Sequence, residues 1–237
     1  MHAPSPTPPV PVDILLAAYR AGIFPMADGR DDPEMFWVEP RERAVFPLDG
    51  FRASTSLRKL LRQQKFEVTC NQDFAGVIAA CAEPRTGGPG EESGTWISHA
   101  IEASYVGLHR AGHAHSVEVW QDGVLVGGLY GVDLPGAFCG ESMFSRAGNA
   151  SKVALAWLVA AMRAAGKSLL DCQFITPHLA SLGAKTMSQA EYLGRLEVAL
   201  ETYARPLPDG FAALARQAQE SGVSPGKLIA QSFTQTS

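Results

Sequence analysis

The sequence predicts an α/β protein in which helices flank a mixed, largely antiparallel sheet, with a small N-terminal domain ahead of it. From Phe66 onward, segments with strand and helix patterns alternate along the chain. Asp122-Gly123 separates two runs of strand-forming residues, which is a strong hairpin signal and predicts antiparallel neighbours. One helix-patterned segment, about 149–165, joins two further strands. A hairpin, a strand, a helix and another strand together make a mixed sheet with helices on its faces.

Bulk properties exclude several classes of protein. A length of 237 residues and a hydrophobic content of 46% suffice for one large domain or two small ones. The net charge of −4 excludes a generally basic nucleic-acid binder. No apolar run reaches the roughly 18 residues of a membrane span, so we expect a cytoplasmic protein with no membrane contact. The cysteines form no CxxC pair and are expected to be reduced core residues; they are Cys70, Cys81, Cys139 and Cys172.

Composition divides the chain into four predicted parts. They are a disordered Pro-rich stub (1–11), a small N-terminal domain with a basic helix (12–65), a catalytic domain (66–205) and a C-terminal tail (206–237). The tail is polar, with one helix expected around 211–220.

The N-terminal domain is predicted to hold two helices. The first covers 13–20 and is ended by Gly22. A stretch rich in Pro, Gly and Asp follows as far as Gly50, interrupted by Phe36-Trp37 and Ala44-Val45-Phe46. The second helix covers 54–64, where Leu57, Leu60 and Leu61 recur at helical spacing.

The catalytic domain repeats the strand and helix patterns several times. Strands are predicted over 66–70, 116–120, 124–130, 138–144 and 169–174. Helices are predicted over 74–81, 98–111, 149–165, 176–182 and 188–203. The Gly/Pro/Glu segment 85–94 is expected to be a mobile loop.

This order of elements is that of N-acetyltransferase-like enzymes. Those enzymes hold the coenzyme A pyrophosphate on a glycine-containing loop that opens the helix after the central strand. The corresponding segment here, Arg146-Ala147-Gly148-Asn149-Ala150-Ser151, lacks the glycines at the required spacing. The sequence therefore disfavours coenzyme A and predicts another kind of acyl donor.

Two carboxylates mark the candidate site. Glu141 and Asp171 each lie in or beside an apolar run, where an unpaired charge is costly and normally has a partner or a chemical use. Gln173 would face the same side of its strand as Asp171. These groups could hold an amine and manage its proton during acyl transfer. The alternative is that both carboxylates only satisfy backbone donors at strand ends.

Other candidates surround these acids. Apolar side chains between the central strand and its helix suit either the core or a pocket; they are Phe138, Met143, Leu158, Met162 and Leu170. Trp96 is either a core residue or a platform on which a base stacks. His113 and His115 have no further ligand at a supporting spacing, so no metal site is predicted.

A basic stripe marks the second predicted helix. Arg58, Arg62 and Lys65 recur on one face, opposite the leucines, with Lys59 beside them. A solvated helix face is the ordinary explanation of such a stripe. In an acidic protein, it also suggests a local contact with a phosphate backbone.

Taken together, these segments resemble the leucyl/phenylalanyl-tRNA–protein transferase family. The resemblance covers most of the chain and rests on 18–25 (AYRAGIFP), 37–40 (WVEP), 94–97 (GTWI), 112–120 (GHAHSVEVW), 126–132 (VGGLYGV), 140–146 (GESMFSR), 149–152 (NASK), 171–173 (DCQ) and 180–184 (ASLGA).

The resemblance implies a bacterial cytoplasmic enzyme with an N-acetyltransferase-like domain. Such an enzyme moves Leu or Phe, and less readily Met, from aminoacyl-tRNA to proteins that begin with Arg or Lys, which marks them for degradation. It implies no metal and no cofactor, and a monomer is expected.

The resemblance also implies roles for individual residues. Asp171 would orient and polarise Gln173, which relays the proton of the attacking amine, and Glu141 would hold the amino group of the donor. Trp96 would stack near the terminal adenosine. The apolar pocket would be formed by Phe138, Met143, Leu158 and Leu170, and the tRNA-binding cluster by Arg58, Lys59 and Arg62.

Some features depart from the family pattern. The usual segment before the first helix is replaced by the Pro-rich stub, and basic family positions are Thr55 and Gln63 here. Two alternatives remain open: another aminoacyl-tRNA-dependent transferase, such as a peptidoglycan cross-bridge enzyme, and a non-enzymatic tRNA- or protein-binding module.

Overall fold

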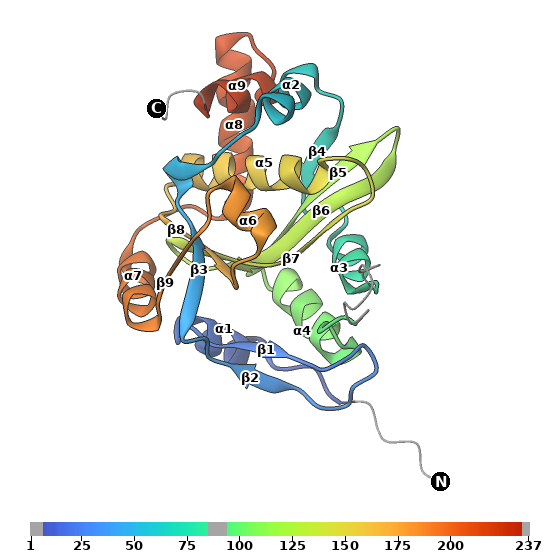
Figure 1. Ribbon diagram of the computed structural model, residues 1–237, viewed down its shortest axis with the longest axis vertical. Coiled ribbons are helices and arrows are strands. Elements are labelled where there is room, and N and C mark those ends of the chain that lie inside the picture. The colour runs from blue at the N-terminus through green and yellow to red at the C-terminus, as the bar shows by residue number, and fades with distance from the viewer. Residues whose placement is uncertain (1–6, 85–93, 234–237) are drawn as a thin grey trace.

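The main feature of the fold is a seven-stranded sheet of order β4-β5-β6-β7-β8-β3-β9 (Figure 1). The computed structural model describes residues 7–84 and 94–233. The strands are β3 (Glu42–Phe46), β4 (Glu67–Cys70), β5 (Ala114–Gln121), β6 (Val124–Asp133), β7 (Ala137–Ser145), β8 (Leu169–Gln173) and β9 (Lys185–Ser188). Among the described strands of this sheet, β7 and β8 alone pair in parallel, and the other neighbours are antiparallel. The predicted mixed, largely antiparallel sheet is confirmed.

Two local features of the sequence explain the strand order at the centre of this sheet. Asp122 and Gly123 both have positive φ, 52° and 74°, as a two-residue hairpin turn between β5 and β6 requires. The predicted crossover helix is α5 (Ala150–Ala165), and it ends at Gly166, whose φ is 82°. Because α5 connects β7 to β8, these two strands lie side by side and run in the same direction.

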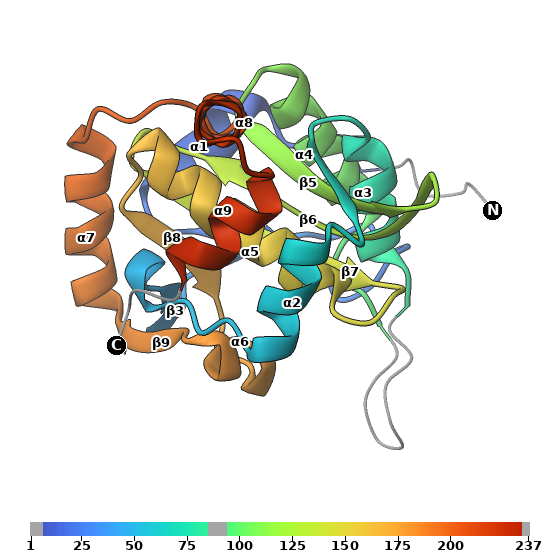
Figure 2. The same ribbon diagram turned by 90° about the horizontal axis from the view of Figure 1, so that it is seen from above.

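Helices cover both faces of the sheet and create two cores. The helices are α1 (Val12–Arg20), α2 (Thr55–Gln63), α3 (Phe74–Ala82), α4 (His99–Arg110), α5, α6 (Pro177–Leu182), α7 (Gln189–Glu201), α8 (Leu207–Ser221) and α9 (Pro225–Ser232), with a 3₁₀ turn at Leu48–Gly50. One core contains α5 with α2, α8 and α9, which Figure 2 shows from above. The other contains α1, α3, α4 and α7. None of the helices in the described part of the chain is long and apolar enough to cross a membrane.

The segment between Gly22 and Gly50 is more regular than its composition suggests. It holds β1 (Phe24–Met26) and β2 (Phe36–Val38), which pair with each other, and β3. Strand β3 joins the main sheet between β8 and β9. It thus carries residues of the predicted N-terminal domain to the strand that bears Asp171.

The predicted tail also differs from the structure. Instead of one helix around 211–220, it forms α8 and α9, and Leu207 and Ile229 are buried against α5 and α2. Helix α9 was missed because its eight residues open with Pro-Gly and carry only a short apolar run. Part of the predicted stub, 1–6, and most of the predicted mobile loop, 85–93, lie outside the described residues.

Candidate active site

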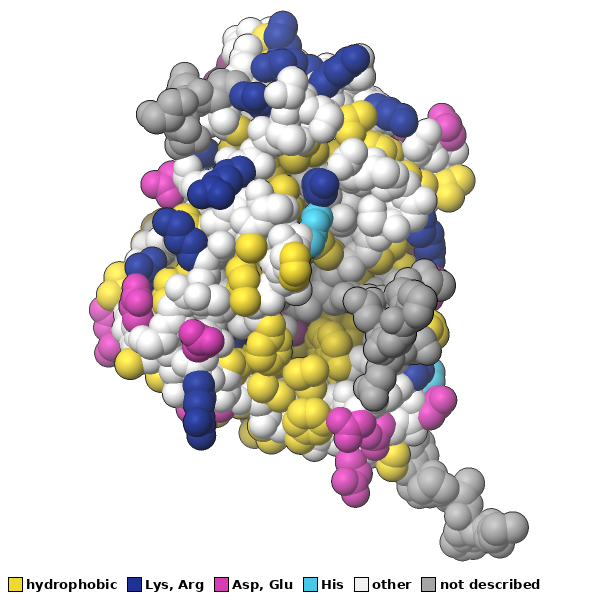
Figure 3. Space-filling view, viewed as in Figure 1, with side chains coloured by type: hydrophobic (Ala, Val, Ile, Leu, Met, Phe, Trp, Pro, Cys, Tyr) yellow, Lys and Arg dark blue, Asp and Glu magenta, His cyan; other side chains and the backbone are white. Residues whose placement is uncertain are grey.

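A cavity of about 380 Å³ opens where β7 and β8 separate. The pairing of these strands ends at Cys139 and Asp171, before Glu141 and Gln173 are reached. The face of the molecule is hollowed in its middle, with hydrophobic side chains around the hollow (Figure 3). The lining comes from β6, β7, α5, β8, α6 and the segment before α4: Trp96, Leu129, Tyr130, Gly140, Glu141, Ser142, Met143, Leu155, Leu158, Leu170, Cys172, Gln173, Phe174, Thr176, His178 and Leu179.

Glu141 is the buried carboxylate of this cavity, with 7% of its surface exposed. Its Oε2 accepts hydrogen bonds from the Tyr105 hydroxyl at 2.9 Å and from Gln173 Nε2 at 2.8 Å. Tyr105 in turn contacts the hydroxyl of Tyr19. The other oxygen of Glu141, Oε1, is buried and has no hydrogen-bond partner among the described residues. Oε2 of Glu141 is therefore held in place, while Oε1 is an unsatisfied buried acceptor of a residue that lines the cavity.

Burial raises the pKa of Glu141 to about 7, although hydrogen bonds from the neighbouring Tyr and Gln side chains act in the opposite direction. The carboxyl therefore changes its charge close to neutral pH. Tyr130 is a second unsatisfied group that lines the cavity, because its buried hydroxyl also lacks a partner among the described residues. Two residues that line the cavity thus each carry a buried polar atom without a hydrogen bond among the described residues, which calls for an explanation.

Asp171 lies behind the cavity wall and does not line it. The side chain is fully buried, and Arg43 of β3 binds its carboxylate through Nε at 2.9 Å and Nη2 at 2.6 Å. The Tyr192 hydroxyl donates to it at 3.0 Å. Oδ1 also accepts the backbone N–H of Gln173 at 2.8 Å. Arg43, Tyr192 and Gln173 thus all bind this carboxylate, and the last of these contacts fixes the backbone of Gln173.

Arg43 is itself fully enclosed. Its guanidinium lies 4.7 Å from the ring centroid of Phe24 and 4.5 Å from that of Tyr192, and Nη1 donates to Gly22 O at 3.0 Å. Burial acts to lower the pKa of Arg43, but the hydrogen bonds and charge of Asp171 outweigh it and raise the pKa. Arg43 and Asp171 therefore form a buried ion pair, and removing either partner would strongly destabilise the fold.

Gln173 connects the two acids. Its φ of 61° lies in the left-handed region, which ends β8 and turns the side chain toward Glu141. Because Nε2 donates to Glu141, the remaining amide atom, Oε1, can only accept a hydrogen bond.

The structure brings most of the predicted site residues together. Glu141, Gln173, Trp96, Met143, Leu158 and Leu170 line the cavity. Phe138 does not line it and is fully buried in the core, as is Met162. His115 lies outside the site, with its ring nitrogens near Asn71 and Asp133.

The predicted basic cluster lies on another part of the surface. Lys59 and Arg62 are exposed on α2, Arg58 is half-buried, and none of them lines the cavity. Figure 3 shows Lys and Arg side chains gathered over α2 and α9 at the upper end of the molecule.

Sequence reasoning missed Arg43 and the tyrosines at positions 19, 105, 130 and 192. Arg43 directly precedes the apolar run Ala44-Val45-Phe46, and this position could have indicated its role. A cation next to a buried apolar strand is itself expected to be buried, and a buried charge is normally paired.

Comparison with known proteins places the chain beside one family. A model of leucyl/phenylalanyl-tRNA protein transferases matches residues 45–197, and a model of the N-terminal domain of those proteins matches residues 10–41. The leucyl/phenylalanyl-tRNA–protein transferase of Novosphingobium aromaticivorans is 54% identical, over 96% of this chain and 97% of that protein. That of Rhizorhabdus wittichii is 58% identical, over 79% of this chain and 74% of that protein.

Among solved structures, L-PGS from Bacillus licheniformis aligns with 91% of this chain and 70% of its own, at 11% identity and a TM-score of 0.38.

Proposed function

This chain belongs to the leucyl/phenylalanyl-tRNA–protein transferase family, and we propose that its central cavity binds the aminoacyl end of charged tRNA. The enzyme is an aminoacyltransferase of the N-end rule type, and its donors are charged with Leu or Phe, and less readily Met. The observation that carries this assignment of the cavity is the unsatisfied Oε1 of Glu141, a residue that lines a largely apolar chamber. An α-amino acid ester presents the matching pair of groups, an apolar side chain and an amine.

The apolar part of the chamber suits the donor side chain. Leu155, Leu158 and Leu170 line it from α5 and β8, and Met143 lines it from β7. The flexible thioether of Met143 adapts to side chains of different shape, which fits an enzyme that accepts Leu, Phe and Met. Trp96 supplies a flat ring for the terminal adenosine.

The chemistry assigned to the site is aminolysis of an ester. The acceptor amine nitrogen forms a bond to the ester carbonyl carbon, and the bond from that carbon to the ribose oxygen breaks. The proton leaving the amine is passed through Gln173 Oε1, and the released ribose hydroxyl takes up a proton. Glu141 holds the donor amine, and Asp171 is a positioning residue that acts through the Gln173 backbone. Because amine and ester react downhill, placement of the two reactants supplies much of the rate.

The partners are proposed on the same basis. The acceptors are proteins that begin with Arg or Lys, which transfer marks for degradation, and the enzyme works in the cytoplasm as a monomer. Arg58, Lys59 and Arg62 on α2 contact the phosphate backbone of the tRNA. Thr55 and Gln63, which stand at positions that are basic in the family, weaken or shift this contact. The family match supports neither the cross-bridge enzyme nor the binding module.

The test is transfer of labelled Phe from charged tRNA to a peptide that begins with Arg. We expect Gln173→Asn to lower transfer at least tenfold, because Asn keeps the amide and tolerates positive φ but cannot reach Glu141. Circular dichroism and melting verify that the variant is folded. Transfer at the wild-type rate would remove Gln173 from the mechanism, and no transfer by the wild-type protein would refute the proposed function.

The size of the chamber predicts donor choice. Cys172 lines the cavity and is only partly buried, so a larger side chain there would fill the cavity rather than overpack the core. Cys172→Leu is expected to lower transfer of Phe about tenfold relative to Leu, and Cys172→Ala to shift the ratio toward Phe. The measurement is competition between the two charged tRNAs, with Cys172→Ser as the isosteric control. Equal ratios in all four proteins would place the donor side chain elsewhere.

A further inference from the structure

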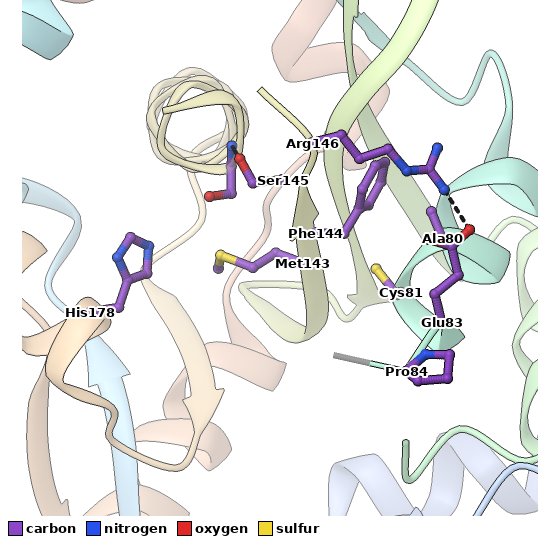
Figure 4. Close-up of a pocket in the computed structure, with 10 residues that line it drawn as sticks. Ala80, Cys81, Glu83, Pro84, Met143, Phe144, Ser145, Arg146 and His178 are labelled. Atoms are coloured by element: carbon purple, nitrogen blue, oxygen red, sulfur yellow. Dashed lines mark hydrogen bonds and ion pairs between the residues drawn. The ribbon is translucent and has the colours of Figure 1, made fainter. Parts of the chain in front are cut away.

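A second cavity, of about 470 Å³, adjoins the aminoacyl chamber (Figure 4). Met143 and His178 line both cavities, so the two spaces meet at these side chains. Its wall is formed by the end of α3, the end of β7, the start of α5 and α6, and it includes Glu83, Phe144 and Arg146. The proposed mechanism uses only the first cavity and leaves this one without a role.

Basic groups face this second cavity from two sides. Arg146 lies on one side and His178 on the other (Figure 4). Lys152 lies close enough to His178 that its charge, after the larger effect of burial, contributes to lowering the pKa of the imidazole. Of the described lining residues, Glu83 carries the opposing charge, and its Oε1 accepts a hydrogen bond from Arg146 Nη2 at 2.6 Å. The guanidinium carries five N–H groups, so this single contact leaves donors for an anion.

We propose that this cavity binds the nucleotide that precedes the terminal adenosine of the charged tRNA. The inference rests on the proposed function, because it concerns the part of the donor tRNA that lies outside the first cavity. A charged tRNA does not end at its adenosine, so the preceding phosphodiester must leave the chamber through an adjoining space. Arg146 and Lys152 supply cations for that phosphate, and the Arg146 plane, 5.2 Å from the Phe144 ring centroid, supplies a stacking surface for the base.

Charge argues against the acceptor protein as the occupant. A peptide that begins with Arg or Lys would bring a further cation beside Arg146 and Lys152, and among the described residues that line the cavity Glu83 alone would offset it. The segment 146–151 is also where an acetyltransferase of this fold would hold a pyrophosphate, and it lacks the glycines for one. A single phosphodiester held by side chains needs no such glycine loop.

The first experiment measures binding of the dinucleotide CpA and of adenosine to the full-length protein. We expect Arg146→Gln to weaken CpA binding about tenfold and leave adenosine binding unchanged. The salt dependence should change in parallel, with the slope of log K against log salt falling by about 0.7. Glu83→Gln is expected to strengthen CpA binding severalfold, because it removes the competing carboxylate. Arg110→Gln, an exposed position on α4 outside both cavities, is the matched control.

The second experiment uses the phenylalanyl esters of CpA and of adenosine as donors. Arg146→Gln should lower transfer from the CpA ester about tenfold and leave transfer from the adenosine ester unchanged. Equal loss with both donors, or no loss with either, would overturn the assignment. If the wild-type protein transfers from neither ester, the proposed function fails. In that case, Arg146-dependent binding of CpA would still support the nucleotide site in the second cavity. Absence of such binding would refute the nucleotide site as well.

Discussion

Replacing Arg43 with Met is expected to lower the free energy of unfolding by about 3–5 kcal/mol and to abolish transfer. The substitution leaves Asp171, which is fully buried, without the cation that binds both its oxygens. It also removes the side chain that joins β3 to β8 and packs between the rings of Phe24 and Tyr192. Urea unfolding followed by circular dichroism measures the loss of stability.

The double variant Arg43→Met/Asp171→Asn separates stability from chemistry. Both charges are then absent, so most of the lost stability should return. Asn keeps an oxygen that can accept a hydrogen bond from the backbone N–H of Gln173. In the wild-type protein Asp171 accepts this bond at 2.8 Å. If Asp171 only orients Gln173, transfer should recover to within about tenfold of wild type. A folded double variant that transfers nothing would show that the reaction needs the negative charge.

This ion pair also shows which parts of the site could be predicted from the sequence. The pattern of apolar residues predicted β7, α5 and β8, and so placed Glu141 and Asp171 on neighbouring strands. It did not distinguish their surroundings. The partner of Asp171 comes from β3, more than a hundred positions away along the chain, in a segment whose Pro, Gly and Asp content suggested no strand. A buried ion pair between distant segments leaves no periodic signal.

Gln173 and Phe138 illustrate the same limit at single positions. A regular strand places Asp171 and Gln173 on one face, but the left-handed φ of Gln173 instead ends the strand and directs its amide to Glu141. Phe138 has the residue type of a pocket wall, yet it lies on β7 before the strands separate and is enclosed in the core. Where a strand ends and where two strands part depend on tertiary packing, which composition does not encode.

Glu141 should make both transfer and stability depend on pH, in opposite directions. Its pKa in the folded protein, about 7, lies above the ordinary value of 4.5, with burial as the main cause. Between these values the folded protein holds a proton that the unfolded chain has lost. The free energy of unfolding therefore falls as pH rises from about 4.5 through 7, by at most roughly 3 kcal/mol from this group. Glu141→Gln should remove this dependence and be more stable than wild type at pH 8.

The charged form that destabilises the fold is the form that binds the donor amine. Binding of 3′-phenylalanylamino-adenosine, a non-reactive donor analogue, should therefore strengthen as pH rises through about 7 and weaken again above about 8, where the ligand amine loses its proton. In Glu141→Gln the lower limb should vanish and binding should be at least tenfold weaker at pH 7.5. Titration calorimetry across pH 5.5 to 9 measures both limbs. A lower limb that persists in Glu141→Gln would assign it to another group and leave Glu141 with a structural role alone.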